Sequence, residues 1–210
     1  MGTHPFDKIQ TELTNLPGEK AHLELYPTRV SSGEIIQKGL NYRLSAVLIL
    51  VYLDQGIPHF ILTQRHDYNG QHSGQISFPG GKVEESDETT KHTALRETEE
   101  ELGVSPTLVN IRGQLTDVFI PVSQFLIHPY LGTLEQLPPL SPNQREVKEV
   151  IHCSVQDLLK DTNLVTTKIQ LQNGMTMKDV PAFSLQDKIV WGATAVILNE
   201  FKFILRRIYS

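Results

Sequence analysis

Three glutamates, Glu97, Glu100 and Glu101, carry the most specific chemical signal in this chain. In an α-helix, residues spaced i, i+3 and i+4 lie on one face, so the three carboxylates would stand close together. Their mutual repulsion asks for a compensating cation, and carboxylate oxygens suit Mg²⁺, Mn²⁺ or Ca²⁺ better than zinc. The spacing therefore predicts a divalent metal site on one turn of a helix.

The alternative interpretation is a solvated acidic stretch on a surface helix, which is what most glutamate runs are. Here, however, the glutamates belong to a longer pattern, Arg-Glu-x-x-Glu-Glu-x-Gly, which runs from Arg96 to Gly103. A chance match to its five named residue types has odds of about one in ten thousand in a chain of this length. The pattern therefore favours the metal site.

A glycine turn leads into this helix. The segment Phe78-Pro79-Gly80-Gly81 interrupts any regular element, so the chain enters the helix from a turn. We expect Ser86 or Asp87 to cap the helix N-terminus and Gly103 to follow its C-terminus.

At these residues the chain resembles the Nudix hydrolases, whose signature reads Gly-x5-Glu-x7-Arg-Glu-U-x-Glu-Glu-x-Gly-U, where U is a bulky aliphatic residue. Two departures occur: six residues instead of five separate Gly81 from Glu88, and Thr98 takes an aliphatic position. Neither departure removes a carboxylate. We expect Arg96 and Glu88 to form an ion pair that orients the helix. The residues in register with the signature are Glu88, Arg96, Glu97, Glu100, Glu101, Gly103 and Val104.

The upstream segment is similar to the coenzyme A pyrophosphatase branch of this family. It reads Leu62-Thr63-Gln64-Arg65 and then His72-Ser73-Gly74-Gln75-Ile76-Ser77-Phe78-Pro79-Gly80-Gly81. That branch shares the longer loop, but it normally has Leu-Arg where this chain has Asn69-Gly70. The resemblance covers about residues 43–206.

The resemblance implies that Glu97, Glu100 and Glu101 hold Mg²⁺ or Mn²⁺, with the backbone carbonyl of Gly80 or Gly81 as a further ligand. It also implies a small-molecule nucleotide substrate, namely coenzyme A or acyl-coenzyme A, split into phosphopantetheine and adenosine 3′,5′-bisphosphate. Hydrolysis of a diphosphate needs charge neutralisation and a positioned water molecule, which such a site supplies. The alternatives are a Nudix pyrophosphatase that acts on ADP-ribose or a dinucleotide, favoured by Gly70, and a non-catalytic nucleotide-sensing module.

Five further residues are candidates for the site. Arg65 is suited to clamp a phosphate, because a guanidinium binds phosphate through two hydrogen bonds. His72 and Gln75 are candidates to line the substrate pocket. Glu146 and Glu149 are both candidates for the general base, and the sequence does not choose between them.

Composition describes one ordinary globular domain of 210 residues with a net charge of −5. That charge argues against a nucleic-acid partner. One cysteine, Cys153, excludes an internal disulfide, and we expect a plain buried residue there. No apolar run is long enough to span a membrane. We therefore expect a cytoplasmic enzyme with no membrane partner, and a homodimer is possible by analogy with the family.

The fold class that these patterns and the resemblance predict is α/β, a Nudix-type α/β/α sandwich with a mixed β-sheet. Residues 1–40 would form an N-terminal helix and extension, and residues 41–210 the Nudix hydrolase domain. The expected elements are an appended amphipathic helix over 6–16, a hairpin of 45–52 and 59–64, extended segments at 107–111, 113–122 and 125–134, a loop at 137–142, a strand at 149–153, a helix at 154–160 capped by Ser154, and a stretch at 190–203 that the resemblance makes helical.

Overall fold

The computed structural model describes residues 6–66, 74–170 and 174–209, and its centre is a mixed β-sheet of eight strands. The order along the main path is β3-β2-β1-β7-β5, with β4 beside β1, β6 beside β7 and β8 beside β2. Strands β1 and β7 run parallel and the other pairs antiparallel, which confirms the predicted mixed sheet. The strands are β1 (Arg43–Asp54), β2 (Ile57–Arg65), β3 (Ile76–Ser77), β4 (Gly80–Lys82), β5 (Asn110–Gln114), β6 (Val118–Ile120), β7 (Phe125–Thr133) and β8 (Val147–Ser154).

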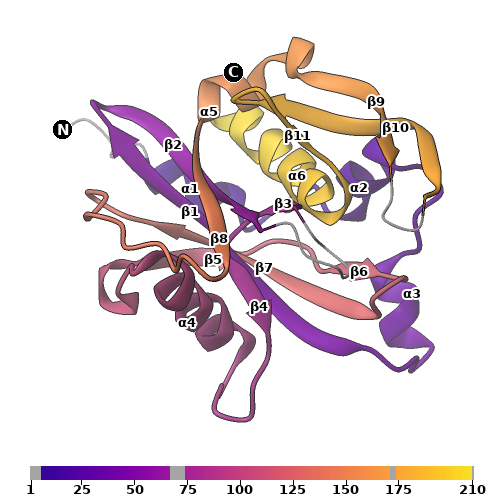
Figure 1. The fold of residues 1–210 in the computed structure, drawn as a ribbon, viewed down its shortest axis with the longest axis horizontal. Coiled ribbons are helices and arrows are strands. Elements are labelled where there is room, and N and C mark those ends of the chain that lie inside the picture. Colours follow the sequence, from indigo (N-terminus) through magenta and orange to yellow (C-terminus); the bar gives the residue numbers. More distant parts are fainter. Residues whose placement is uncertain (1–5, 67–73, 171–173, 210) are drawn as a thin grey trace.

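Two long helices cover opposite faces of this sheet (Figure 1). Side chains alternate along β1, so Leu48 and Leu50 pack with Leu102 of α4 (Thr90–Leu102), whereas Ile49 and Val51 pack with residues of α6 (Gly192–Tyr209). The result is the predicted α/β/α sandwich. The stretch at 190–203 that the resemblance made helical lies largely within α6.

The first two strands form the predicted hairpin. Their two-residue turn, Gln55-Gly56, has φ values of 49° and 81°, both in the left-handed region that a glycine accepts without strain. Residues Val51 and Phe60 pair across the hairpin. Because β2 runs from this turn to Arg65, the hairpin delivers Arg65 to the opposite end of the sheet from the turn.

The N-terminal segment is integrated into the main core. The predicted helix over 6–16 is shorter, since α1 spans Asp7–Glu12, and it is followed by α2 (Glu19–Leu25) and α3 (Ser32–Gln37). Phe6 and Ile9 are buried in the same cluster as the α6 side chains, so the word "appended" is wrong for this helix.

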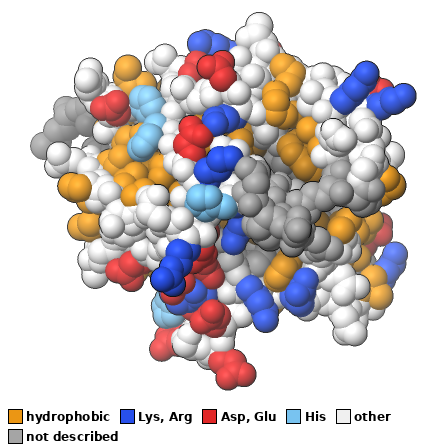
Figure 2. All heavy atoms as spheres, in the orientation of Figure 1, with side chains coloured by type: hydrophobic (Ala, Val, Ile, Leu, Met, Phe, Trp, Pro, Cys, Tyr) orange, Lys and Arg blue, Asp and Glu red, His pale blue; other side chains and the backbone are white. Residues whose placement is uncertain are grey.

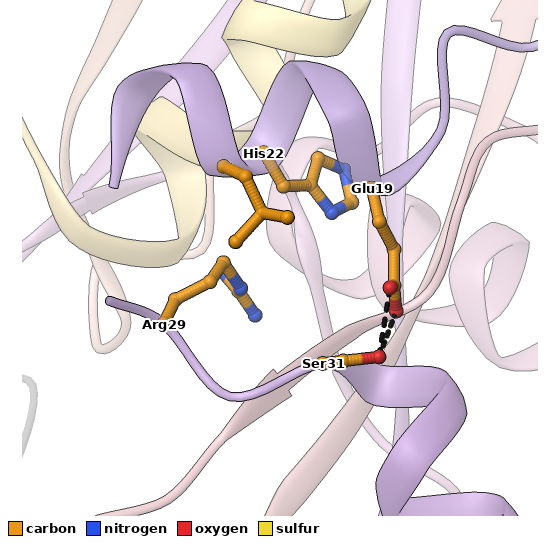
Figure 3. A pocket seen from close by; sticks show the side chains of 5 residues that line it. Glu19, His22, Arg29 and Ser31 are labelled. Carbon is orange, nitrogen blue, oxygen red and sulfur yellow. Dashed lines mark hydrogen bonds between the residues drawn. The ribbon is translucent and has the colours of Figure 1, made fainter. Parts of the chain in front are cut away.

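A buried carboxylate ties the N-terminal segment to α6. Glu200 accepts hydrogen bonds from the Gly18 amide (3.1 Å) and the Thr116 hydroxyl (2.7 Å), and it lies 3.1 Å from His22 Nε2. Beside His22 is a cavity of about 10 Å³, in which Ser31 donates to both carboxylate oxygens of Glu19 (Figure 3). A cavity of that size holds at most one water molecule, so it is not a nucleotide site.

A second sheet lies between α5 (Val155–Leu159) and α6, in a region where we predicted no strands. The short helix α5 begins with the predicted Ser154 cap, whose hydroxyl accepts from the Gln156 amide at 3.1 Å. Strands β9 (Leu164–Gln170), β10 (Thr176–Leu185) and β11 (Lys188–Val190) then form an antiparallel sheet beside α6 (Figure 1). Short 3₁₀ turns occur at Pro106–Leu108 and Asp161–Asn163. Within the described ranges, the helices fall short of the length and apolar character that a membrane span requires.

Candidate active site

Helix α4 carries the three glutamates. Its C-terminus ends at the expected residue, but its N-terminus is capped by a different residue from those expected. The N-cap is Thr89, whose hydroxyl accepts from the His92 amide at 3.2 Å, so the expectation of Ser86 or Asp87 is wrong. At the other end, Gly103 takes the left-handed conformation (φ 73°) and donates its amide to the Glu99 carbonyl at 2.8 Å, as predicted.

The three glutamates lie in different environments on this helix. Glu101 is buried, and the Thr63 hydroxyl of β2 donates to it at 3.3 Å. The pKa of Glu101 is raised to about 7, mainly by burial; Arg65 opposes this rise, and the nearby Glu97 and Glu146 contribute to it. Burial also raises the pKa of Glu97, against the effect of Arg96. Glu100 is half-exposed.

Arg96 organises the acidic side chains, but its main partner is Asp87 and not Glu88. The guanidinium donates to both oxygens of Asp87 at 3.0 Å and lies 3.1 Å from both Glu97 and Glu100. This bidentate contact lowers the pKa of Asp87 to about 2. Glu88 instead points to solvent, 3.7 Å from His92, so the predicted Arg96–Glu88 pair is wrong.

The physical reason is the turn that precedes the helix. Asp87 donates its amide to the Glu84 carbonyl at 3.0 Å and accepts the Glu84 amide on Oδ2 at 2.9 Å, which turns its carboxylate inward. The Thr93 hydroxyl also donates to that carboxylate, at 2.9 Å. The six-residue loop therefore places Asp87, one residue earlier than expected, against Arg96.

The two glycines before the helix allow the backbone to approach the site closely. A Cβ on Gly81 would overlap the carboxylate of Glu97, and a Cβ on Gly80 (φ 153°) would overlap the backbone of Ala46 and Val47. A side chain at Gly80 would therefore require the backbone to shift, whereas one at Gly81 would require only the flexible Glu97 side chain to move. This contact places the backbone at Gly81 next to the Glu97 carboxylate, where the predicted carbonyl ligand has to be.

The two candidates for the general base lie in different surroundings. Glu146 influences the pKa values of both Glu97 and Glu101, and Asn143 connects it to the helix by donating its amide to the Glu101 carbonyl (2.9 Å) and its side chain to Glu146 (3.0 Å). Glu149 instead lies 2.6 Å from Lys188 of β11. The structure therefore brings Glu146, and not Glu149, together with Glu97 and Glu101.

The remaining candidates lie at the end of β2. Arg65 lies close enough to Glu101 to oppose the rise in the pKa of that carboxyl, and the backbone amide of Arg65 donates to the Gln75 carbonyl at 3.0 Å. Gln75 thus lies directly beside Arg65. His72 lies outside the described residues, as do Asn69 and Gly70.

The side chains and backbone at this turn offer oxygen atoms, which are the ligands that a hard divalent cation prefers. These oxygen atoms belong to carboxylates from one helical turn, one of them buried with a pKa raised by burial, next to a glycine backbone. Across residues 6–66, 74–170 and 174–209, however, no three His, Cys, Asp or Glu side chains already converge as a metal cage. Arg96 holds Glu97 and Glu100, and Glu101 turns toward Thr63, so these flexible side chains would have to reorient around an ion.

A broader hollow of about 680 Å³ lies at the tip of the β1–β2 hairpin, away from the glutamates. Tyr52, His59 and His152 line it, and Tyr52 Oη lies 2.7 Å from His152 Nδ1. Trp191 is only partly buried and lies outside the hydrophobic clusters. Cys153 is buried as predicted, and burial raises the pKa of its thiol to about 12.

Comparison with known proteins agrees with this fold and site. Residues 42–171 match the family model described as "NUDIX domain". The human mitochondrial coenzyme A diphosphatase NUDT8 is 35% identical over 181 residues, which cover 85% of this chain and 75% of that protein, and the mouse NUDT8 is 37% identical over 156 residues, covering 73% of each. Among solved structures, the Nudix hydrolase RenU from M. smegmatis has a TM-score of 0.54 at 17% identity, covering 79% of this chain and 87% of that one, and supports the fold alone.

The chain therefore belongs to the Nudix family and is a diphosphatase. The predicted resemblance to the coenzyme A pyrophosphatase branch is confirmed, because two of the similar relatives carry that name. Enzymes of this family generally use divalent metal cations.

Sequence reasoning missed Asp87, which lies at the site, and Lys188, which pairs with the candidate Glu149. Asp87 was assigned as a helix cap, although the extra loop residue was a signal that the partner of Arg96 had moved. Lys188 had no sequence signal that we used, since it lies in the unpredicted second sheet.

Proposed function

We propose that this enzyme hydrolyses the diphosphate of coenzyme A or acyl-coenzyme A, giving phosphopantetheine and adenosine 3′,5′-bisphosphate, with Mg²⁺ or Mn²⁺ as cofactor. The observation that carries the chemistry is the acidic turn of α4, where Glu101 is buried and Glu97, one turn before it, lies against Gly81. The substrate is supported by the names of the two NUDT8 relatives.

Glu97, Glu100 and Glu101 would hold the metal, with the carbonyl of Gly81 or Gly80 as a further ligand. When bound, a divalent ion at this place neutralises phosphoryl oxygens and lowers the pKa of a coordinated water molecule. Arg96 orients two of these carboxylates through its contacts at 3.1 Å. The chain thus supplies hard oxygen ligands on one helical turn, and their side chains would reorient around the ion.

Two residues outside the helix would act on the substrate side. Arg65, which lies at the end of β2 and faces Glu101, would bind a phosphate oxygen, with Gln75 beside it in the pocket. Of the two candidates for the general base, we favour Glu146, because it lies close enough to Glu97 and Glu101 to influence both. Glu149 is less suited, because Lys188 pairs with its carboxylate at 2.6 Å.

The alternative substrate class is ADP-ribose or a dinucleotide. Gly70, where the coenzyme A branch normally has arginine, is the sequence feature that favours this class, and it lies outside the described residues. A non-catalytic sensing module is disfavoured because all the carboxylates of the signature are present.

The metal site is tested by Glu100→Gln and Glu101→Gln, with Glu99→Gln as the matched control, since Glu99 is exposed on the same helix. Loss of a residue that merely supports a metal ligand costs about 10–100-fold, so loss of a ligand should cost at least about 100-fold in turnover. We expect both variants to stay folded, to lose Mg²⁺ or Mn²⁺ uptake in calorimetry, and to lose turnover, whereas Glu99→Gln keeps all three. Full turnover of either variant at saturating Mg²⁺ would refute the metal assignment.

The substrate is tested with a panel of coenzyme A, acyl-coenzyme A, ADP-ribose and a dinucleotide. We expect the highest kcat/KM with coenzyme A or its acyl derivatives; a higher value with ADP-ribose or the dinucleotide would favour the alternative. The cytoplasmic location and the homodimer stay predictions. Cell fractionation decides the first, all the more because the two named relatives are mitochondrial, and light scattering decides the second.

A further inference from the structure

Lys188 reaches from the second sheet to the end of the main sheet. Its Nζ lies 2.6 Å from Glu149 Oε2 of β8 and 3.2 Å from Gln64 Oε1 of β2. Gln64 and Glu149 are direct partners in the β2–β8 ladder. Lys188 therefore places a cation at the same end of β2 as Arg65, although it lies outside the segment that matches the family model.

Fold stability does not explain this cation. The Lys188 and Glu149 side chains are 30% and 47% exposed, and ion pairs that exposed contribute little to folding. The second sheet is already attached to the main core by Phe183, Leu185 and Val190, all buried among the α6 side chains. The cation is thus available for another role.

The two cations lie on opposite faces of the same strand end. Thr63 and Arg65 point to the face of α4, where both act on Glu101, so Gln64 between them points to the other face, where it meets Lys188. On the face shown in Figure 2, Lys and Arg side chains are interspersed with acidic ones. In a protein of net charge −5, an anionic substrate depends on such local cations.

Coenzyme A carries a diphosphate and, separated from it by the ribose, a 3′-phosphate. The metal ligands and Arg65 account for the diphosphate on the α4 face. We propose that Lys188 binds the ribose 3′-phosphate at the strand end and so makes the enzyme discriminate coenzyme A from 3′-dephospho-coenzyme A. This inference rests on the proposed function and adds a specificity residue to it. Glu149 acts as a competing anion, and Lys188 Nζ also donates to Gln64 Oε1 at 3.2 Å, which holds the lysine at the end of β2.

Opposite effects of two substitutions test this role. Removing the cation with Lys188→Met should raise KM for coenzyme A about tenfold, the scale of one charge-assisted hydrogen bond, and leave KM for 3′-dephospho-coenzyme A unchanged. Glu149→Gln should lower KM for coenzyme A, because the lysine loses its competing carboxylate. Lys178→Met, an exposed lysine on the same sheet, is the matched control and should leave both values unchanged.

A merely structural ion pair would give a different result. Both Lys188→Met and Glu149→Gln would then change the two substrates equally, and that outcome, or an unchanged KM ratio, overturns the inference. If Lys188→Met fails to fold, Lys188→Gln, which keeps a hydrogen bond to Glu149, takes its place with the same expected change in ratio.

Failure of the proposed function is recognised separately. Wild-type enzyme that hydrolyses neither coenzyme A nor its 3′-dephospho form refutes the proposed substrate. Calorimetry with adenosine 3′,5′-bisphosphate and with AMP then judges the lysine alone. Tighter binding of the bisphosphate that depends on Lys188 supports the inference, and equal binding by wild type and Lys188→Met overturns it.

Discussion

Replacement of Asp87 by asparagine tests whether this residue, and not Glu88, supports the helix of the active site. The Asp87 side chain is 3% exposed, and its pKa is lowered from 3.8 to about 2. A lowering of that size corresponds to about 2 kcal/mol of stability at neutral pH. We therefore expect Asp87→Asn to lower the free energy of unfolding by about 2 kcal/mol at pH 7.

The cost should depend on pH with a definite sign. Because the folded-state pKa of Asp87 lies below the unfolded value, its contribution is present in full above about pH 5 and is lost as the pH falls through the folded value near 2. Roughly half of the difference between wild type and variant should remain at pH 3. Urea unfolding at pH 7, 5 and 3 measures it directly.

Glu88→Gln is the matched control, because it removes one negative charge at the next residue in the chain. The Glu88 side chain is 83% exposed. We expect it to change stability by no more than about 0.5 kcal/mol at any of these pH values. An equal cost for the two substitutions at pH 7, or an Asp87→Asn cost that does not shrink on acidification, would refute the assignment of the Arg96 partner.

Three further outcomes follow from the geometry. Gly80→Ala should destabilise the protein by at least about 2 kcal/mol in urea unfolding, because its Cβ meets rigid backbone. Gly81→Ala should cost less stability but lower turnover at least about tenfold, because the flexible Glu97 must move aside. Equal stability costs of the two variants would contradict this reasoning. Glu200→Gln should lower the unfolding free energy by about 3 kcal/mol, since buried donors lose their charged acceptor, and a change within about 0.5 kcal/mol would show that the contacts are dispensable. Cys153, with a pKa of about 12, should resist iodoacetamide at pH 8 in native protein and react in urea, as mass spectrometry would show; equal rates in the two states would refute its burial.

Features that depend on neighbours in the sequence were predictable. The hairpin turn at Gln55-Gly56, the Ser154 cap and the left-handed Gly103 each follow from the conformational preferences of a few adjacent residues. The acidic helix α4 is predictable for the same reason, because one helical turn fixes the spacing of its glutamates. Its N-terminal cap was not, since Asp87 is drawn away from capping by Arg96, nine residues further along the chain.

The choice between Glu146 and Glu149 illustrates what the sequence could not provide. In the β2–β8 ladder Gln64 pairs with Glu149 but Arg65 pairs with Val147, so a bulge at this point leaves Lys148 as an extra residue. A bulge changes which side chains share a face, and nothing in the local pattern reveals it. The two glutamates also differ in position, because Glu146 lies just before β8 and is linked to α4 through Asn143, whereas Glu149 lies within β8 and meets Lys188.

Some residues of the candidate site are positioned by one local segment and others by contacts between distant strands. We expect mutations in the two groups to have different effects. The acidic turn, Gly81 and Arg96 belong to one continuous segment and would surround the reacting phosphates of the proposed substrate, so we expect changes there to lower kcat. Two strands and a separate sheet converge on the other face of the strand end, where they bring together Gln64, Glu149 and Lys188. We expect changes at these residues to alter KM and the choice of substrate. The C-terminal sheet is thereby the part of this chain in which substrate preference can change without loss of the hydrolytic machinery.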